Sequence, residues 1–133
     1  MRLLIDTNIF FELILKQEKA EEAKNILSKT QEHELFISDY SLHSIGLLLF
    51  RRKQHNVFRQ FVIDMISNAG ETIISLSDSD MVTVINAAQS FSLDFDDAYQ
   101  YVAAEKYNLT IISFDSDFDR TEKGRKTPGN CEL

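Results

Sequence analysis

Short apolar runs alternate with stretches of helical periodicity along this chain. Four runs have the length of strands and end at polar residues: 2–5, 35–38, 72–76 and 110–113. Strands that alternate with helices form a parallel sheet covered by helices on both faces. The pattern therefore predicts an α/β fold with a central parallel sheet of about four or five strands flanked by helices. The predicted helices cover approximately 7–15, 20–33, 42–49, 58–69, 81–88 and 93–107.

Two of the predicted helix starts carry side chains that commonly cap helices. Asp39 and Ser41 are expected to cap the third helix. Asp94 and Asp97 resemble a capping box at the start of the sixth helix, with Asp in the place of Glu. In the fifth helix, the apolar side chains that we expect to face the core are Met81, Val82, Ile85 and Ala88.

Length and apolar content bound the size of the folded unit. The 133 residues, of which 44% are hydrophobic, suffice for one core without disulfide or structural-metal staples. We therefore expect a single domain over residues 1–133, with an irregular tail from about residue 121. The longest apolar run, 45–50, is far too short to cross a bilayer, which predicts a cytoplasmic protein without a membrane partner. The single cysteine, Cys131, excludes an intrachain disulfide.

The charge balance argues against a general nucleic-acid-binding module. The formal net charge is -7 and the pI is near 4.9, so a broad basic surface for phosphates is absent. Basic residues cluster in two stretches, 51–59 and 120–126. These clusters either contact phosphates locally or are solvated helix ends and tails.

Acidic residues recur where predicted strands end and helices begin. Because the carboxyl ends of parallel strands meet at one edge of a sheet, these carboxylates are expected to lie close together. Such a group repels itself unless a hard divalent cation such as Mg²⁺ or Mn²⁺ neutralises it, and this favours metal-dependent phosphodiester chemistry. Each acid taken alone is equally typical of a helix cap or a first helical turn. The acidic positions are Asp6, Asp39, Asp94, Asp96, Asp97, Asp115, Asp117 and Asp119.

The order and spacing of four segments resemble the PIN domain family. The segments are LLIDTNIFFELI, SDYSLHSIGLLL, DFDDAYQYVAA and TIISFDSDFD, and the resemblance extends from Met1 to about Arg120. It is strongest to small single-domain PIN proteins related to VapC-type toxins. This resemblance implies a PIN-like α/β fold that binds Mg²⁺ or Mn²⁺ through three or four acidic residues and cleaves RNA.

The same resemblance assigns roles to individual residues. It implies that Asp6, Asp97 and Asp115 are catalytic and bind the metal, with Asp117 as a further ligand. The second acidic position of the family, normally Glu, aligns with Ser44 in this chain. The possible auxiliary residues are Asn8, His43, Ser44 and Asp96.

The expected function is therefore a metal-dependent endoribonuclease, the toxin-like member of a toxin–antitoxin pair. RNA and an antitoxin protein are the expected partners. A homodimer is also expected, because the third and fourth helices carry apolar surface that supports it. The alternative is a catalytically impaired PIN-domain protein that acts through RNA or protein binding, because Ser44 replaces a carboxylate.

Three side chains near the expected site have two interpretations each. His43 either acts as a general acid or contacts RNA, or it is a structural residue of its helix. Tyr99 and Tyr101 either stack a base at the mouth of the site or pack in the core, and packing is the favoured interpretation.

Overall fold

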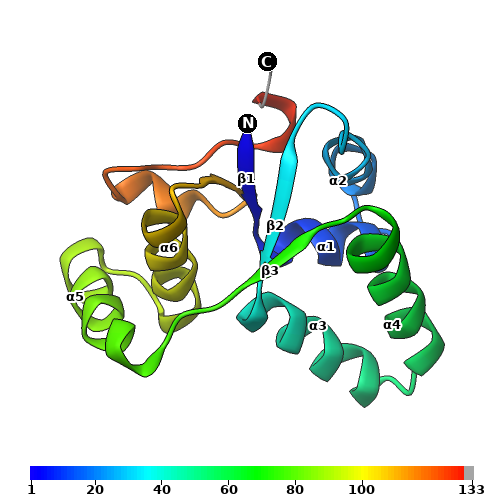
Figure 1. Ribbon diagram of the computed structural model, residues 1–133, viewed down its shortest axis with the longest axis horizontal. Helices are drawn as coiled ribbons and strands as arrows, with labels where there is room; N and C mark the ends of the chain where they lie inside the picture. Colours follow the sequence, from blue (N-terminus) through cyan, green and yellow to red (C-terminus); the bar gives the residue numbers. More distant parts are fainter. Residues whose placement is uncertain (131–133) are drawn as a thin grey trace.

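The computed structural model describes residues 1–130. Its centre is a four-stranded sheet in the order β3-β2-β1-β4, in which every neighbouring pair is parallel (Figure 1). The predicted parallel α/β sheet is thereby confirmed. The strands are β1 (Arg2–Ile5), β2 (Glu34–Ser38), β3 (Thr72–Ile74) and β4 (Thr110–Ile112).

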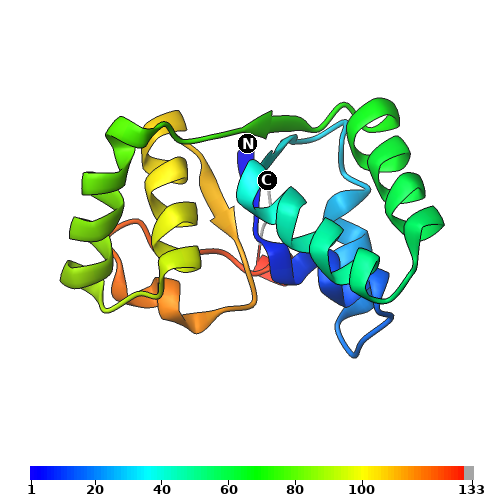
Figure 2. The same cartoon turned by 90° about the horizontal axis from the view of Figure 1, so that it is seen from below.

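Helices cover both faces of the sheet, as the sequence predicted. Figure 2 shows α5 and α6 on one side and the first four helices on the other. The α-helices are α1 (Thr7–Ile14), α2 (Ala20–Leu27), α3 (Asp39–Arg51), α4 (His55–Val62), α5 (Met81–Phe91) and α6 (Phe95–Tyr107). A π-helical segment, η1 (Ile63–Asn68), extends α4, and the 3-10 turns are η2 (Asp78–Asp80), η3 (Ser116–Arg120) and η4 (Pro128–Asn130). No helix within residues 1–130 combines the length and the apolar character needed to cross a membrane.

The sheet separates two apolar cores because successive strand residues point to opposite faces. Leu3 and Ile5 belong to the core under the first four helices, whereas Leu4 belongs to the core under α5 and α6. All three side chains are fully buried. After the exposed Arg2 at its start, the central strand β1 is thus apolar, and the first polar residue after the strand is Asp6.

The face of α5 that contacts the core differs from the predicted one. Val84 and Ala87 are buried, while Val82 and Ile85 are 66% and 55% exposed. Both pairs satisfy helical spacing, so the sequence pattern does not separate them. The second core includes Val84 and Ala87 next to α6, where the small side chain of Ala87 permits close helix packing.

The predicted caps of α3 and α6 are also corrected. Ser38 caps α3, since its Oγ accepts a hydrogen bond from the Ser41 backbone N–H at 3.1 Å. Asp39 is instead the first residue inside this helix. Asp94 holds the N-cap position of α6, but its side chain makes no capping hydrogen bond within the described part of the chain. The Asp97 side chain is therefore not used in a capping box.

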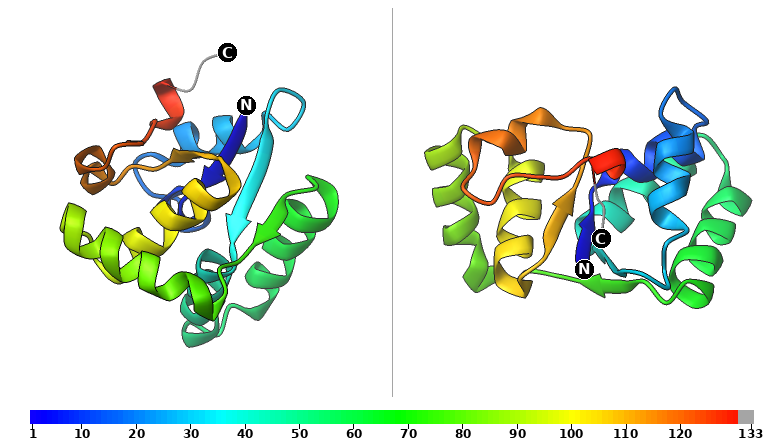
Figure 3. Two further views of the ribbon diagram at one scale, coloured as in Figure 1. Left: turned by 60° about the vertical axis from the view of Figure 1, so that its left-hand side comes forward. Right: turned by 90° about the horizontal axis from the view of Figure 1, so that it is seen from above.

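The tail returns to the open edge of β4 (Figure 3). Lys126 donates its backbone N–H to the Ile111 carbonyl at 2.8 Å and accepts from the Ser113 N–H at 3.0 Å. These bonds form an isolated parallel bridge with Ile112, and η4 then packs against α2. Cys131, on which the disulfide argument rests, lies outside the described residues.

Candidate metal centre

A polar cavity lies at the carboxyl end of the sheet, where β1, β2 and β4 lead directly into α1, α3 and the loop before η3. Its volume is about 290 Å³. The cavity brings together Asp6, Asp97 and Asp115, which the sequence predicted to converge. The lining residues are Asp6, Thr7, Asn8, Phe11, Tyr40, Ser44, Asp96, Asp97 and Asp115.

Asp6 is buried at the junction of β1 and α1, where it is the N-cap of the helix. Its Oδ1 accepts from the Thr7 N–H and from Gln100 Nε2, each at 2.9 Å. Its Oδ2 accepts from Ser113 Oγ at 2.6 Å. Burial raises the pKa of Asp6, although these hydrogen bonds oppose the shift. The three hydrogen bonds hold the carboxylate in one orientation at the floor of the cavity.

Ser113 links Asp6 to the loop after β4. Its Oγ also accepts from Asn8 Nδ2 at 3.1 Å and from the Asp115 N–H at 2.9 Å. Asn8 Oδ1 in turn accepts from the Phe114 N–H at 3.2 Å. Asn8 thus braces the loop that carries Asp115, and its connection to Asp6 runs through Ser113.

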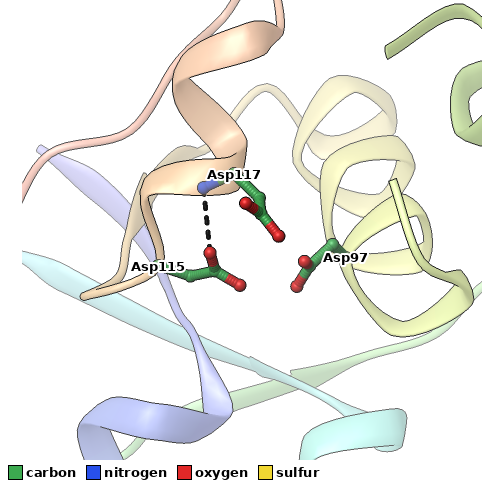
Figure 4. Close-up of side chains that lie close together, drawn as sticks. All are labelled: Asp97, Asp115 and Asp117. Atoms are coloured by element: carbon green, nitrogen blue, oxygen red, sulfur yellow. Dashed lines mark hydrogen bonds between the residues drawn. The ribbon is translucent and has the colours of Figure 1, made fainter. Parts of the chain in front are cut away.

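Asp97, Asp115 and Asp117 form the closest group of carboxylates. One oxygen from each lies within 4.8 Å of the others (Figure 4). Asp97 comes from the first turn of α6, whereas Asp115 caps η3 and accepts from the Asp117 N–H at 2.9 Å. Burial and the adjacent Asp115 raise the pKa of Asp97 to about 8. Without a cation, the group therefore retains a proton near neutral pH.

This group fits a hard divalent cation. Its donors are carboxylate oxygens alone, which is the ligand set that Mg²⁺ and Mn²⁺ prefer. Gln100 lies one helical turn after Asp97, and its buried Oε1 has no hydrogen-bond donor among the described residues. A buried amide oxygen in a polar site requires a donor such as an ordered water. The residues present therefore fit a hydrated cation.

The other predicted auxiliary residues separate into two groups. Asp96 and Ser44 line the cavity, so the position that aligns with the family's Glu does face the acidic group. His43 is exposed and is not among the residues that line the cavity in the described chain. It borders a separate apolar groove between α3 and α4, which we call the α3–α4 groove, lined by Leu42, His43, Gly46, Leu47, Phe50 and Phe58.

Asp39 does not join the other acids in the cavity, contrary to its predicted grouping. Its Oδ1 accepts from the Tyr99 hydroxyl at 2.7 Å and from the Tyr40 N–H at 2.8 Å. Asp119 is exposed and pairs with Arg125 at 3.1 Å. Both carboxylates are thereby engaged in local contacts outside the group of Asp97, Asp115 and Asp117.

Tyr99 and Tyr101 are both buried, which confirms the packing interpretation. The Tyr99 hydroxyl accepts from the Leu76 N–H at 3.0 Å in addition to its bond with Asp39. Tyr101 packs edge-on against Phe91, with ring centroids 5.3 Å apart. Neither ring lines the cavity in residues 1–130, whereas Tyr40 does.

Sequence reasoning missed three residues of the site: Gln100, Ser113 and Tyr40. Gln100 follows Asp97 by three residues, a spacing that places both on one helical face. Ser113 stands between a buried strand and Asp115, and Tyr40 opens the helix that follows β2. Each of the three residues lies close in sequence to a predicted acid or a helix start, which could have marked it as a candidate. Only the fold shows which polar side chains point into the cavity.

Solved structures with the same fold cover nearly the whole chain. A toxin–antitoxin complex from Klebsiella pneumoniae matches with a TM-score of 0.75 and 21% identity over 95% of this chain and 97% of that one. VapBC2 from Rickettsia felis, bound to a promoter DNA fragment, gives 0.74 and 17% identity over 95% and 97%. VapC20 from Mycobacterium tuberculosis, a sarcin-ricin loop cleaving toxin, gives 0.72 and 18% over 88% and 92%. Because these sequence identities are low, the comparisons show only that the folds are alike.

Sequence comparison gives the family. No curated protein matches the chain. The family model of the PIN domain, in contrast, matches residues 3–124, which include β2, β3, β4, all of β1 except Arg2, and every carboxylate of the cavity. The chain therefore belongs to the PIN domain family.

Proposed function

We propose that this protein is a metal-dependent endoribonuclease that hydrolyses RNA phosphodiester bonds with Mg²⁺ or Mn²⁺ as its cofactor. The observation that carries the proposal is the group of Asp97, Asp115 and Asp117, which adjoins a cavity whose floor is Asp6. Membership of the PIN domain family supports nuclease chemistry at this place. Purely structural caps would not require carboxylates from α6 and from η3 to face one another.

Each side chain has a distinct role in this proposal. Asp97, Asp115 and Asp117 hold the cation. Asp6, which the resemblance also gives as a metal ligand, is outside this group of three in the described chain and supplies a negative charge at the base of the cavity. A bound divalent cation would lower the pKa of a water molecule and offset the charge that develops on the phosphate. Asp6, Asp97 and Asp115 are the proposed catalytic residues. Asn8 and Asp96 are auxiliary, whereas His43 receives no role because it borders the α3–α4 groove.

The partners follow from the structural relatives. A toxin–antitoxin complex from Klebsiella pneumoniae contains a chain of this fold, and the Mycobacterium tuberculosis relative is a sarcin-ricin loop cleaving toxin. We propose that this chain is the toxin-like member of such a pair, that it acts on RNA in the cytoplasm, and that an antitoxin protein restrains it. We also propose a homodimer, formed through the α3–α4 groove.

A second candidate function has one specific observation in its favour. Ser44 lines the cavity at the position that aligns with the family's Glu, so the metal shell has one fewer carboxylate. A weakly charged shell suits a catalytically impaired PIN-domain protein that acts through RNA or protein binding. We rank it second because three carboxylates still converge on one point.

The test is a metal-dependent cleavage assay on a mixed RNA pool with the purified protein. We expect cleavage in Mn²⁺, slower cleavage in Mg²⁺, and none in chelator. Asp6→Asn should reduce the rate by at least about 100-fold, because several kcal/mol of transition-state stabilisation are at stake. Asp119→Asn is the matched control, since Asp119 is exposed and pairs with Arg125; its rate should equal that of the wild type.

One further variant in the same assay separates the two candidate functions. Ser44→Glu adds a carboxylate to the cavity wall and should tighten Mn²⁺ binding and raise the rate of cleavage. If neither the wild type nor Ser44→Glu cleaves any RNA while both bind metal, the catalytically impaired PIN-domain protein becomes the better interpretation than a nuclease. Cleavage by Asp6→Asn at the wild-type rate would remove Asp6 from the mechanism.

A further inference from the structure

One row of accessible side chains runs along α3, which lies on the outside of the molecule (Figure 2). The members of the row are spaced by four, three and four residues, so they share one face of the helix. They are Tyr40, Ser44, Leu47 and Arg51. The first two line the acidic cavity, whereas Leu47 and Arg51 are exposed. One face of α3 therefore connects the proposed catalytic site to an exposed guanidinium group.

The middle of this face is apolar. Leu47 and Phe50 are 57% and 55% exposed at the rim of the α3–α4 groove. Gly46 forms part of the same groove, and a Cβ atom there would lie 3.1 Å from Cζ of Phe58. The glycine thus lets the Phe58 ring pack directly on the backbone of α3. An exposed Leu at the centre of such a face suits a two-fold interface, in which the same patch serves both copies of a chain.

The two ends of the face carry opposite charges. At the start of α3 the cavity wall presents carboxylates, among them Asp96 and Asp97. At its end stand Arg51, Arg52 and Lys53, which are exposed and form no ion pair with an acid in residues 1–130. Each copy has a formal net charge of -7, so two copies repel one another unless a basic end meets an acidic one. The charges therefore favour an antiparallel pair of α3 helices over a parallel pair.

Helix geometry gives the register of an antiparallel pair whose two-fold axis passes Leu47. Along the helix, Arg51 lies about 6 Å beyond Leu47 and Ser44 about 4.5 Å before it, at 1.5 Å per residue. The partner subunit's Arg51 is thus offset from Ser44 by only about 1.5 Å along the helix. Packed helices have their axes about 8–10 Å apart, a separation that an extended arginine side chain bridges. The side chain of Ser44 is small and neutral, so it leaves room for the guanidinium group.

We propose that a second copy of the chain packs on this face with α3 antiparallel, and that the partner subunit's Arg51 completes each acidic cavity by binding the RNA phosphate. This inference rests on the proposed function and adds a residue to its site. No Lys or Arg lines the cavity within the described chain, so one copy alone offers the phosphate no side-chain cation there. A guanidinium group binds phosphate through two parallel hydrogen bonds and stays charged at neutral pH. The dimer is then the catalytic unit, because each site draws on both copies.

Cysteine cross-linking tests the antiparallel arrangement independently of activity. In a Cys131→Ser background, Leu47→Cys should form a disulfide-linked dimer, because this position meets its own copy at the two-fold axis. A mixture of Ser44→Cys and Arg51→Cys proteins with different tags should form disulfides between the two variants. Ile85→Cys, at a similarly exposed position of α5, is the control and should remain a monomer on a non-reducing gel.

Cleavage by mixed dimers tests the role of the arginine. Arg51→Ala alone should cut RNA about 10-fold to 100-fold more slowly than the wild type, because a charged hydrogen bond is lost. Asp97→Asn alone should be inactive. Co-expression of these two variants should restore about one quarter of the wild-type rate, because half of randomly assembled dimers are mixed and each mixed dimer has one complete site. Arg52→Ala, whose side chain is turned by about 100° from that of Arg51, should cleave at the wild-type rate.

The outcomes separate this inference from the proposed nuclease activity. Absence of any link at position 47 would assign the face to a different partner, and self-linked Arg51→Cys would show parallel helices; either result overturns the arrangement. Equal cleavage by Arg51→Ala and the wild type, or no restoration on co-expression, would overturn the role of the partner's Arg51. If the links form as expected but the wild type cleaves no RNA, the antiparallel dimer stands, whereas the nuclease and the role of Arg51 in it are refuted.

Discussion

Glu71 is a buried carboxyl group that is not among the described residues lining the acidic cavity. It is 4% exposed, and neither of its oxygens has a hydrogen-bond partner within residues 1–130. It stands between Gly70, which has a φ of +71°, and the first residue of β3. Burial raises the pKa of Glu71 to about 8. The folded protein therefore carries this group with its proton at neutral pH.

Glu71→Gln should remove a pH dependence of stability. The folded-state pKa is about 8 and the ordinary value is 4.5, so the folded state binds the proton more tightly than the unfolded state. The contribution of Glu71 to stability is fully present below pH 4.5 and is lost as the pH rises through 8. Over this window the wild type should lose up to about 1.4 kcal/mol per pH unit relative to Glu71→Gln.

Urea unfolding at pH 5, 7 and 9 checks this expectation. Glu34→Gln, which changes an exposed Glu at the start of β2, is the control and should follow the wild type at every pH. Parallel pH profiles for the wild type and Glu71→Gln would show that Glu71 is ionised in the folded state or finds a partner there.

At the level of single residues, the sequence predicted the acids of the site better than the polar residues that hold them. Asp6, Asp97 and Asp115 stand at strand ends or helix starts, and position alone placed them at one sheet edge. Gln100 and Ser113 donate to Asp6 from distant parts of the chain. Their inward orientation depends on packing in three dimensions, which no local pattern encodes.

At the level of elements, the site depends on how the start of α6 meets η3. Asp97 belongs to α6, Asp115 caps η3 and Asp117 lies within η3, and 17 intervening positions separate Asp97 from Asp115. Three carboxylates within 4.8 Å repel one another across this junction. A bound cation would replace that repulsion with a shared attraction and fix the two elements together.

Mn²⁺ should accordingly raise the melting temperature of the wild type by several degrees. A ligand that binds only the folded state contributes about 2.7 kcal/mol at 100 times its dissociation constant. Asp97→Asn should show little or no shift, because it loses one of the three ligands. In chelator above pH 8, Asp97→Asn should have a higher melting temperature than the wild type. The raised pKa of Asp97 means that its ionised form is unfavourable in the folded protein, and Asn removes that charge.

Differential scanning fluorimetry with and without millimolar Mn²⁺ measures these shifts. Asp119→Asn should respond to Mn²⁺ as the wild type does. An equal metal-induced shift in Asp97→Asn would place the cation elsewhere.

The elements themselves were predicted well, but their inward faces were predicted less well. The alternation of apolar runs and helical periodicity identified all four strands, because buried parallel strands are apolar throughout. In α5 the predicted face was partly wrong, since Val82 and Ile85 are exposed and Val84 and Ala87 are buried. The phase of this helix is set by its packing against α6, and two overlapping stripes satisfied the same periodicity.

At the scale of the whole molecule, the α3–α4 groove is an apolar surface feature separate from the acidic cavity. Its volume is about 450 Å³, and Leu47 and Phe50 at its rim are 57% and 55% exposed. Figure 1 shows α3 and α4 on the side of the molecule away from α5 and α6. Contiguous exposed apolar surface marks an interaction site more often than it occurs by chance. The sequence predicted apolar surface on these helices, but the groove itself required the fold.

If the groove joins two copies of the chain, Leu47→Asp should convert a dimer into a monomer. The charge would be buried without a partner in the dimer but would remain in water in the monomer, so the cost falls on association alone. Sedimentation velocity at micromolar concentration should give about twice 15.3 kDa for the wild type and 15.3 kDa for Leu47→Asp. Ile85→Asp places the same charge on an equally exposed site of α5 and should leave the dimer intact. A monomeric wild type, or a dimeric Leu47→Asp, would assign the groove to another partner, and the antitoxin would then be the first one to test.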